Sequence, residues 1–172
     1  MSGPGTWIAV LTAAAVLLIM AGEAVLSRVN EAGLRRQGAV EPPGDVYRVM
    51  QWAYPASFLA MALEGAWRGP ATAWMLLGGL AIFGMAKALK LWAIASLGER
   101  WSFRVLVLPG RALVASGPYR WIRHLNYLAV LGEILGVALT VRAPVTGLMG
   151  LVGFGALLRR RIAIEDRALG RQ

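Results

Sequence analysis

The stretch WIAVLTAAAVLLIMAGEAVLS, residues 7–27, contains a single charged side chain, Glu23. About 20 apolar residues suffice for an α-helix to cross the hydrocarbon core of a bilayer. Residues 1–6 carry no Lys or Arg, and the apolar run that follows is longer than the core of a usual signal peptide. We therefore predict that residues 7–27 form a retained membrane-spanning helix.

Four more apolar stretches follow, at residues 49–67, 71–95, 126–141 and 144–158. The last two are short, so they could instead form a helical hairpin whose second helix continues as far as Ala168. Of the 172 residues, 58% are hydrophobic and only 16% are charged, which favours a membrane protein over a soluble one. We predict an all-α integral membrane protein with about five transmembrane helices, forming one domain over residues 1–172.

The 18 Lys and Arg residues are distributed unevenly between the predicted loops. The first loop, the third loop and the C-terminal tail hold Arg28, Arg35, Arg36, Arg48, Arg100, Arg104, Arg111, Arg120, Arg123, Arg159, Arg160, Arg161, Arg167 and Arg171. The second and fourth loops hold only Arg68 and Arg142. Because cytoplasmic loops are enriched in basic residues, this pattern predicts an N-terminus outside and a C-terminus in the cytoplasm. The same topology accounts for the net charge of +9, so we expect no nucleic-acid partner.

The third loop contains two short β-rich runs, residues 104–108 and 112–115, on either side of Pro109-Gly110. Runs of this kind around a turn are typical of a β-hairpin. We therefore predict a small hairpin on the cytoplasmic face, just before the fourth helix. The first loop, residues 28–47, is predicted to be a polar connection with a Pro/Gly turn.

Ionisable residues inside a membrane span are costly, so each is a candidate for a functional role. Glu23 and Glu64 lie near helix ends and could reach the membrane interface, whereas Glu133 lies deeper. Lys87 and Lys90 are predicted to extend toward the cytoplasm, and they are the nearest basic candidates to pair with Glu133. Such a pair could either fix the register of two helices or belong to a substrate pocket.

Two polar patches are predicted to face the same side of the membrane: GPYRWIRHLNY, residues 117–127, and RIAIED, residues 161–166. The first holds the chain's one histidine, His124. Their guanidinium groups suit a carboxylate, their carboxylates an ammonium or a ribose diol, and their tyrosines a ring. S-adenosylmethionine carries all of these groups, although other zwitterions and dinucleotides match as well. The absence of cysteine, of GxGxxG and of a Walker-type loop argues against a Cys-based metal site and a soluble-type nucleotide fold.

The joint pattern GPYxxxRHxxY and RxxxEDxxL resembles the isoprenylcysteine carboxyl methyltransferase family of integral membrane enzymes. The string Gly98-Glu99-Arg100-Trp101 is similar to that family too, so the resemblance covers roughly residues 89–169. Before that, the spacing of the apolar stretches and the Arg28-x-Asn30-Glu31 segment look like those of its short bacterial members. Leu125 departs from the family pattern, which usually has proline at that position.

The resemblance implies a role for each residue that matches the family motif. Cofactor-binding residues for S-adenosylmethionine would be Tyr119, His124, Leu125, Asn126, Tyr127 and Glu165. Residues that orient the methyl acceptor would be Arg123, Arg161 and Asp166. The acceptor would be a lipophilic molecule that enters from the bilayer, either a prenylated cysteine with a free carboxylate or a phenolic or polyketide-type lipid. The site would lie on the cytoplasmic side of a bacterial inner membrane.

Three other functions remain open from the sequence. Phospholipid N-methyltransferases and NADPH-dependent membrane reductases of the sterol type carry strings similar to Arg123-His124-x-x-Tyr127. A helical membrane subunit with a basic face toward anionic lipid would explain the arginine distribution. It would not explain why the two patches occur together at the family's spacing.

Overall fold

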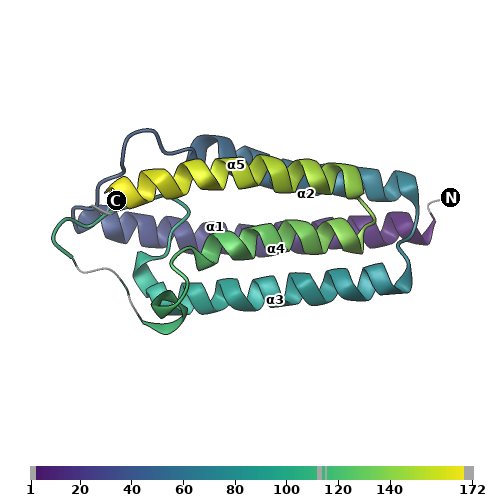
Figure 1. Ribbon diagram of the computed structural model, residues 1–172, viewed down its shortest axis with the longest axis horizontal. Helices are drawn as coiled ribbons and strands as arrows, with labels where there is room; N and C mark the ends of the chain where they lie inside the picture. The colour runs from purple at the N-terminus through teal and green to yellow at the C-terminus, as the bar shows by residue number, and fades with distance from the viewer. Residues whose placement is uncertain (1–2, 112–113, 115, 169–172) are drawn as a thin grey trace.

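The computed structural model describes residues 3–111, 114 and 116–168. Its elements are α1 (Pro4–Arg36), α2 (Tyr47–Arg68), α3 (Ala73–Leu97), η1 (Gly98–Arg100), η2 (Gly117–Arg120), α4 (Leu125–Thr140) and α5 (Pro144–Ala168). Successive α-helices run antiparallel along the long axis of the molecule (Figure 1). The long connection between α3 and α4 therefore lies at the same end as the last turns of α1 and α5, and the N-terminus lies at the opposite end (Figure 1).

Within the described residues, two helices are long and apolar enough to cross a membrane: Pro4–Arg36, and Ala73–Arg100, which combines α3 with η1. The five predicted apolar stretches correspond to the five α-helices, which confirms the all-helical prediction for the described residues. The last two stretches form a helical hairpin whose second helix continues to Ala168, which was one of the two predictions for them: α4 has 16 residues and α5 ends at Ala168. That all five helices cross the bilayer stays a prediction.

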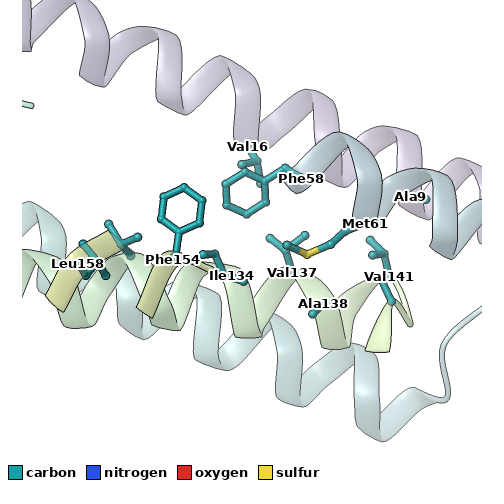
Figure 2. Packing of buried hydrophobic residues seen from close by; sticks show 12 residues of the cluster. Ala9, Val16, Phe58, Met61, Ile134, Val137, Ala138, Val141, Phe154 and Leu158 are labelled. Carbon is teal, nitrogen blue, oxygen red and sulfur yellow. The ribbon is translucent and has the colours of Figure 1, made fainter. Parts of the chain in front are cut away.

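An apolar core runs between the helices along most of their length. Phe58 and Met61 of α2 are fully buried, and they face Ile134 and Val137 of α4 and Phe154 of α5 (Figure 2). Burying side chains of this size stabilises a fold by about 1.5–3 kcal/mol each relative to full exposure in water. The outward faces of the helices carry large apolar side chains that are exposed, for example Leu18 and Leu63. This is expected of a surface that contacts lipid.

Glycines bring α3 and α4 into close contact, as small residues do between membrane helices. A Cβ atom at Gly136 would lie 2.6 Å from the backbone nitrogen of Phe83, and one at Gly79 would lie 2.5 Å from that of Thr140. At Gly132 the nearest atom would be the Cβ of Ala86, at 2.9 Å. Because no larger residue fits at Gly79 and Gly136 without moving a backbone, these positions fix how closely the two helices approach.

The predicted β-hairpin of the third loop is not supported. In the described part of this loop, Val107 forms an isolated antiparallel bridge with Val40 of the first loop. Their backbone hydrogen bonds are 2.9 and 3.0 Å long, so the first run pairs with a distant segment rather than with its neighbour. The second predicted run lies largely outside the described residues. Residues 104–108 do have β-propensity, but the backbone N–H and C=O of Val107 pair with Val40 rather than with the second run of a hairpin.

The first loop is also shorter than predicted. The α1 helix continues for more than two turns past residue 27 and ends at Arg36, with Arg35 and Arg36 in its last turn. Basic side chains are favourable there because they complement the helix dipole. As a result, residues 28–36 belong to a helix, and two of their side chains, Asn30 and Glu31, contact the connection between α3 and α4.

Candidate functional site

A cavity of about 730 Å³ opens at the loop end of the bundle. Its wall includes residues from all five α-helices and from the loop between α3 and α4. Sites for small molecules and cofactors usually have volumes of about 300–1,000 Å³. The cavity is therefore large enough for a cofactor together with part of a second molecule.

The two polar patches of the sequence meet at this cavity. His124, just before α4, lies opposite the last turns of α5: its Nδ1 is 4.0 Å from Glu165 Oε2, and its Nε2 is 3.7 Å from Asp166 Oδ2. The three side chains are only about one quarter to one third exposed. The His124 ring also stacks on that of Tyr127, with centroids 5.6 Å apart and planes 10° from parallel. We call His124, Tyr127, Arg161, Glu165 and Asp166 the loop-end site.

Tyr127 and Arg161 hold the centre of the loop-end site. The Tyr127 hydroxyl donates to Glu165 Oε2 at 2.7 Å and accepts from Arg161 Nε at 3.2 Å. A carboxylate and a guanidinium on consecutive turns of α5 are therefore linked through one phenol of α4. This arrangement fixes the direction in which Glu165 points.

Arg161 is 5% exposed, and all three of its guanidinium nitrogens contact other residues of the chain. Nη2 donates to the carbonyl of Phe103 and lies 3.9 Å from Asp45 Oδ2, and Nη1 approaches Met50 Sδ at 3.6 Å. A buried guanidinium needs partners of this kind to offset the cost of desolvation. Arg161 thus ties the first loop and the α3–α4 loop to α5.

Tyr119 and Arg123 lie on the same wall with different environments. Burial raises the pKa of the Tyr119 phenol to about 12, and the Glu165 carboxylate adds to this shift, so the phenol is neutral at physiological pH. Arg123 is exposed and lines the cavity. The site therefore offers a neutral hydroxyl from η2 and a cationic guanidinium from the loop that follows.

Asn126 and Trp101 complete this wall. The Trp101 indole N–H points to Asn126 Oδ1 at 3.5 Å, and the Trp101 carbonyl accepts a 2.8 Å hydrogen bond from the Asn30 amide. Trp101 is 1% exposed. The Gly98–Trp101 segment thus contacts the start of α4 through Trp101 and Asn126. Asn30 of α1 fixes this segment by hydrogen bonds to the carbonyls of Gly98 and Trp101.

Ion pairs join the two loops that cover the cavity. Arg104 contacts Glu41 at 2.7 Å and Glu31 at 3.3 Å, while Arg35 contacts the second oxygen of Glu41 at 2.7 Å. Burial alone would raise the pKa of the Glu41 carboxyl, but the hydrogen bonds from Arg104 and Arg35 outweigh it and hold that pKa below its usual value. The first loop is therefore bound to the α3–α4 loop by charge as well as by the Val40–Val107 bridge.

A second polar group lies deeper, where the cavity reaches the helices. Lys87 and Lys90 of α3 each contact both Glu23 of α1 and Glu133 of α4, at 2.8 and 3.0 Å respectively. Tyr54 of α2 donates its hydroxyl to Glu133 Oε2 at 2.6 Å. We call these five residues the interhelical cluster. Both lysines, which were the candidate partners of Glu133, do pair with it. The expectation that they extend toward the cytoplasm was wrong, because their ammonium groups are held between Glu23 and Glu133.

The structure brings most of the predicted site residues to one cavity. Those that line it are Tyr119, Arg123, His124, Asn126, Tyr127, Arg161 and Glu165. Asp166 contacts His124 from outside the described cavity wall. Leu125 is 1% exposed and packs at the first turn of α4, also outside that wall. The helix begins at Leu125 even without the proline that the family pattern usually has there.

Sequence reasoning missed several residues that shape the site. Asp45, Met50 and Phe103 surround Arg161, and Tyr54 lines the inner wall beside Lys90, which the sequence analysis had already considered for a substrate pocket. Asp45 was recognised only as part of a turn. The signal for the inner wall was the presence of Lys87, Lys90 and Glu133 inside apolar stretches. The two lysines share a helix face because they are three residues apart.

Comparison with known proteins shows which family the chain belongs to. The model of the isoprenylcysteine carboxyl methyltransferase (ICMT) family matches residues 79–171, which include both polar patches. The chain belongs to the ICMT family. Membership identifies it as a membrane methyltransferase, in agreement with the apolar helices α1 and α3.

Two relatives of this ICMT-family chain extend the similarity over almost its whole length. The uncharacterized protein YpbQ of Bacillus subtilis (strain 168) is 35% identical over 158 residues, which cover 90% of this chain and 93% of the relative. An uncharacterized protein of Haemophilus influenzae is 28% identical over 160 residues, covering 92% and 93%. No solved structure gives a significant match.

Proposed function

We propose that the protein is an S-adenosylmethionine-dependent integral membrane methyltransferase that O-methylates a carboxylate or a phenolic hydroxyl of a lipophilic acceptor. The observation that carries the proposal is the convergence of the two motif halves. His124 and Glu165, 41 positions apart in the sequence, approach to 4.0 Å at the wall of a 730 Å³ cavity. A chain of the ICMT family that used these residues only for folding would have no need of a cavity beside them.

The residues around the cavity match the groups of S-adenosylmethionine. Among the described residues, His124 Nδ1 is a buried nitrogen with no hydrogen-bond partner, and the residue that carries it lines the cavity. Such a group is costly unless a ligand or water satisfies it. Exposed Arg123 can take the carboxylate of the methionine part, Glu165 an ammonium or a ribose diol, and Tyr119 or Tyr127 the edge of the adenine ring.

In this proposal the loop-end site works by positioning. Transfer of the sulfonium methyl group is an in-line displacement, which gains from fixed orientation and from exclusion of water. Arg161 holds Tyr127, and Tyr127 in turn aims Glu165, so we assign Arg161 to positioning rather than to direct contact with the acceptor. Asp166 would orient His124 from the side away from the cavity.

The acceptor would enter from the bilayer. The outer faces of the helices are apolar, and the inner part of the cavity lies between the same helices. With the N-terminus outside, the loop end of the bundle faces the cytoplasm of a bacterial cell, where S-adenosylmethionine is made. Anionic lipid headgroups would then contact the exposed arginines at that end.

Calorimetric titration of S-adenosylmethionine, and of its demethylated product, into the detergent-purified protein tests the proposal. We expect saturable binding to the wild type, and at least a tenfold loss of affinity in His124→Ala and in Glu165→Ala, because each removes a polar contact in a largely desolvated site. Glu99→Ala is the matched control for Glu165→Ala: Glu99 lies at the same end of the molecule but outside the described wall of this cavity. A folded wild-type protein that binds neither compound would overturn the proposed function.

A further inference from the structure

The interhelical cluster joins four helices through charged groups that are largely excluded from solvent. Glu133 is 0% exposed and Lys90 is 2% exposed, and each lysine bridges the same two carboxylates. Two carboxylates and two ammonium groups give a formal charge of zero. Because a buried ion pair often contributes little net stability, a cluster of four charges and a phenol in a membrane helix bundle indicates a functional role.

Part of the cluster is accessible from the cavity. Tyr54 and Lys90 line its inner wall, next to Val130 of α4 and Phe154 of α5. The Tyr54 ring is fixed by an edge contact with Phe58 and a tilted contact with Phe154, with ring centroids 4.9 and 5.2 Å away. A phenol that is held by two aromatic neighbours and reaches a ligand cavity is well placed to contact a bound molecule.

The hydrogen bond from Tyr54 to Glu133 determines which group can bind there. Its one O–H is donated to the carboxylate at 2.6 Å, so the phenolic oxygen can offer only lone pairs to a ligand. Lone pairs accept a hydrogen bond from a hydroxyl, but they repel a carboxylate oxygen. The zero formal charge of the cluster gives an anionic ligand no compensating attraction. Lys90 also lines this wall, but its ammonium group is already paired with Glu23 at 2.8 Å and with Glu133 at 3.0 Å. The Tyr54 oxygen is therefore complementary to a hydroxyl group rather than to a carboxylate.

The distance between the two polar groups suits two bound molecules. Tyr127 of the loop-end site and Glu133 of the interhelical cluster are six residues apart on α4, which corresponds to a rise of about 9 Å. Val130 lies between them and lines the same cavity. A methyl donor at the loop-end site would thus leave room for the ring of an acceptor between its methyl group and Tyr54.

We infer that Tyr54, backed by Glu133, is the contact for the reacting oxygen of the acceptor, and that this acceptor is a phenol or enol whose proton passes through Tyr54 to Glu133. The inference rests on the proposed function for the methyl donor. The acceptor O–H bond breaks as its proton moves to Tyr54, whose own proton moves to Glu133 Oε2. The acceptor oxygen bonds to the methyl carbon, and the carbon–sulfur bond breaks with its electron pair on sulfur.

This scheme conserves charge within the cavity. The sulfonium loses its positive charge when it becomes a neutral thioether, and the cluster gains one when Glu133 is protonated. Lys87 and Lys90 keep the charged carboxylate of Glu23 as a partner while Glu133 holds the proton. A carboxylate acceptor, already anionic at neutral pH, would need no such route.

Two amphiphiles of matched chain length test the inference: a para-alkylphenol and the corresponding fatty acid. Each is titrated into the detergent-purified protein saturated with the demethylated cofactor product. We expect Tyr54→Phe, which keeps the ring and its packing, to weaken alkylphenol binding about tenfold, the usual effect of losing one hydrogen bond. Binding of the fatty acid should not change.

Tyr47→Phe is the matched control, because Tyr47 belongs to the same helix and lines the same cavity, about 10 Å away along α2. This control should bind the alkylphenol as the wild type does. In a second measurement, mass spectrometry follows methylation of the alkylphenol by S-adenosylmethionine. Tyr54→Phe should slow it most at neutral pH and progressively less toward the phenol's own pKa of about 10.

The outcomes separate this inference from the proposed function. If the wild type binds the cofactor but neither binds nor methylates the alkylphenol, the inference is wrong and the proposed function stands. Equal affinities in Tyr54→Phe and Tyr47→Phe, or an equal loss for phenol and fatty acid, would likewise overturn it. A wild type that fails to bind the cofactor would contradict the proposed function itself.

Discussion

The loop-end site and the interhelical cluster are both built from charged and phenolic side chains, but the chain holds them in different ways. The loop-end site joins residues from loops and helix ends, and His124, Glu165 and Asp166 keep about a quarter to a third of their side-chain surface exposed. The interhelical cluster joins the middle parts of four helices, and Glu133 has no exposed surface. Polar groups near water can exchange partners at low cost, whereas polar groups between helices cannot.

This difference predicts a division of roles. Substitutions in the interhelical cluster should mainly change the stability of the fold, unless they preserve its charge balance. Substitutions in the loop-end site should mainly change ligand binding. The conservative change Tyr54→Phe should affect ligand binding without a large loss of stability, because it leaves all four charges of the cluster in place.

The largest effect is expected for Glu133→Gln. The variant leaves Lys87 and Lys90 opposite Glu23 alone, so the cluster carries an uncompensated positive charge in an apolar interior. Removing one partner of a buried ion pair typically costs about 3–5 kcal/mol. Thermal unfolding of the protein in detergent should show a correspondingly large decrease in the unfolding temperature.

The double variant Glu133→Gln, Lys87→Met is the control for charge. It removes one carboxylate and one ammonium group, and Lys90 keeps its 2.8 Å contact with Glu23. We expect it to recover most of the stability that Glu133→Gln loses. If the double variant were less stable than the single one, hydrogen bonds rather than charge balance would hold the cluster together.

A somewhat smaller effect is expected for Gly136→Ala, which tests the helix contact that carries the cluster. The new Cβ would lie 2.6 Å from the Phe83 nitrogen and 2.9 Å from the Gly79 carbonyl oxygen, so α3 and α4 must separate. Overpacking of this kind costs about 1–3 kcal/mol. Since Lys87 and Lys90 approach Glu133 across the same contact, a loss of thermal stability is expected here too.

Gly153→Ala in α5 is the matched control for Gly136→Ala. A Cβ at Gly153 would have no atom within 4 Å, apart from its own helix and chain neighbours. Alanine is preferred over glycine inside a helix by up to about 1 kcal/mol, so this variant should be as stable as the wild type or more so. Equal destabilisation by both substitutions would argue against close packing as the cause.

The sequence predicted the loop-end site better than the interhelical cluster because the two depend on different information. His124 and Glu165 belong to two short strings that resemble a family, and each string keeps its residues close in sequence. The convergence of those strings could be expected once the charge distribution placed both on one side of the membrane. Their contacts with Asp45 and Phe103 could not, because these depend on how two loops pack.

For the fold, the lengths of the apolar stretches predicted the helices but not the contacts that the loops make. The hairpin prediction depended on β-propensity at residues 104–108, and propensity does not indicate the partner, which is Val40. From the sequence Glu23 could reach the membrane interface, and only the packing of α1 near α3 places it beside two lysines. Side chains on different helices are brought together by tertiary structure, which a single sequence does not specify.

In the loop-end site we expect Tyr127→Phe to affect ligand binding more than stability. The variant removes the hydroxyl that links Arg161 and Glu165 but keeps the ring that stacks on His124. Without it Glu165 is free to turn away from the cavity, and we expect about a tenfold loss of S-adenosylmethionine affinity, or ~1.4 kcal/mol. Calorimetric titration measures this, and an unchanged affinity would show that Glu165 needs no positioning.

The smallest effect is expected at Glu41, on the ion pairs that join the two loops over the loop-end site. Burial alone would raise the pKa of Glu41, but Arg104 and Arg35 lower it below the unfolded value. A carboxyl whose pKa is lower in the folded state stabilises the fold above its unfolded pKa, and this contribution is lost as the pH falls through the folded pKa. Because Glu41 and its partners are partly exposed, the contribution should be below about 1 kcal/mol.

Thermal unfolding of the wild type and of Glu41→Gln between neutral and acidic pH measures this contribution. The difference in unfolding temperature should be greatest near neutral pH, shrink in acid and decrease when salt is added, since salt screens exposed charges. The loss of stability in Glu133→Gln should hardly respond to salt, because Glu133 is shielded from solvent. If both variants showed the same salt dependence, the loop-end site and the interhelical cluster would not differ in the way that their exposure implies.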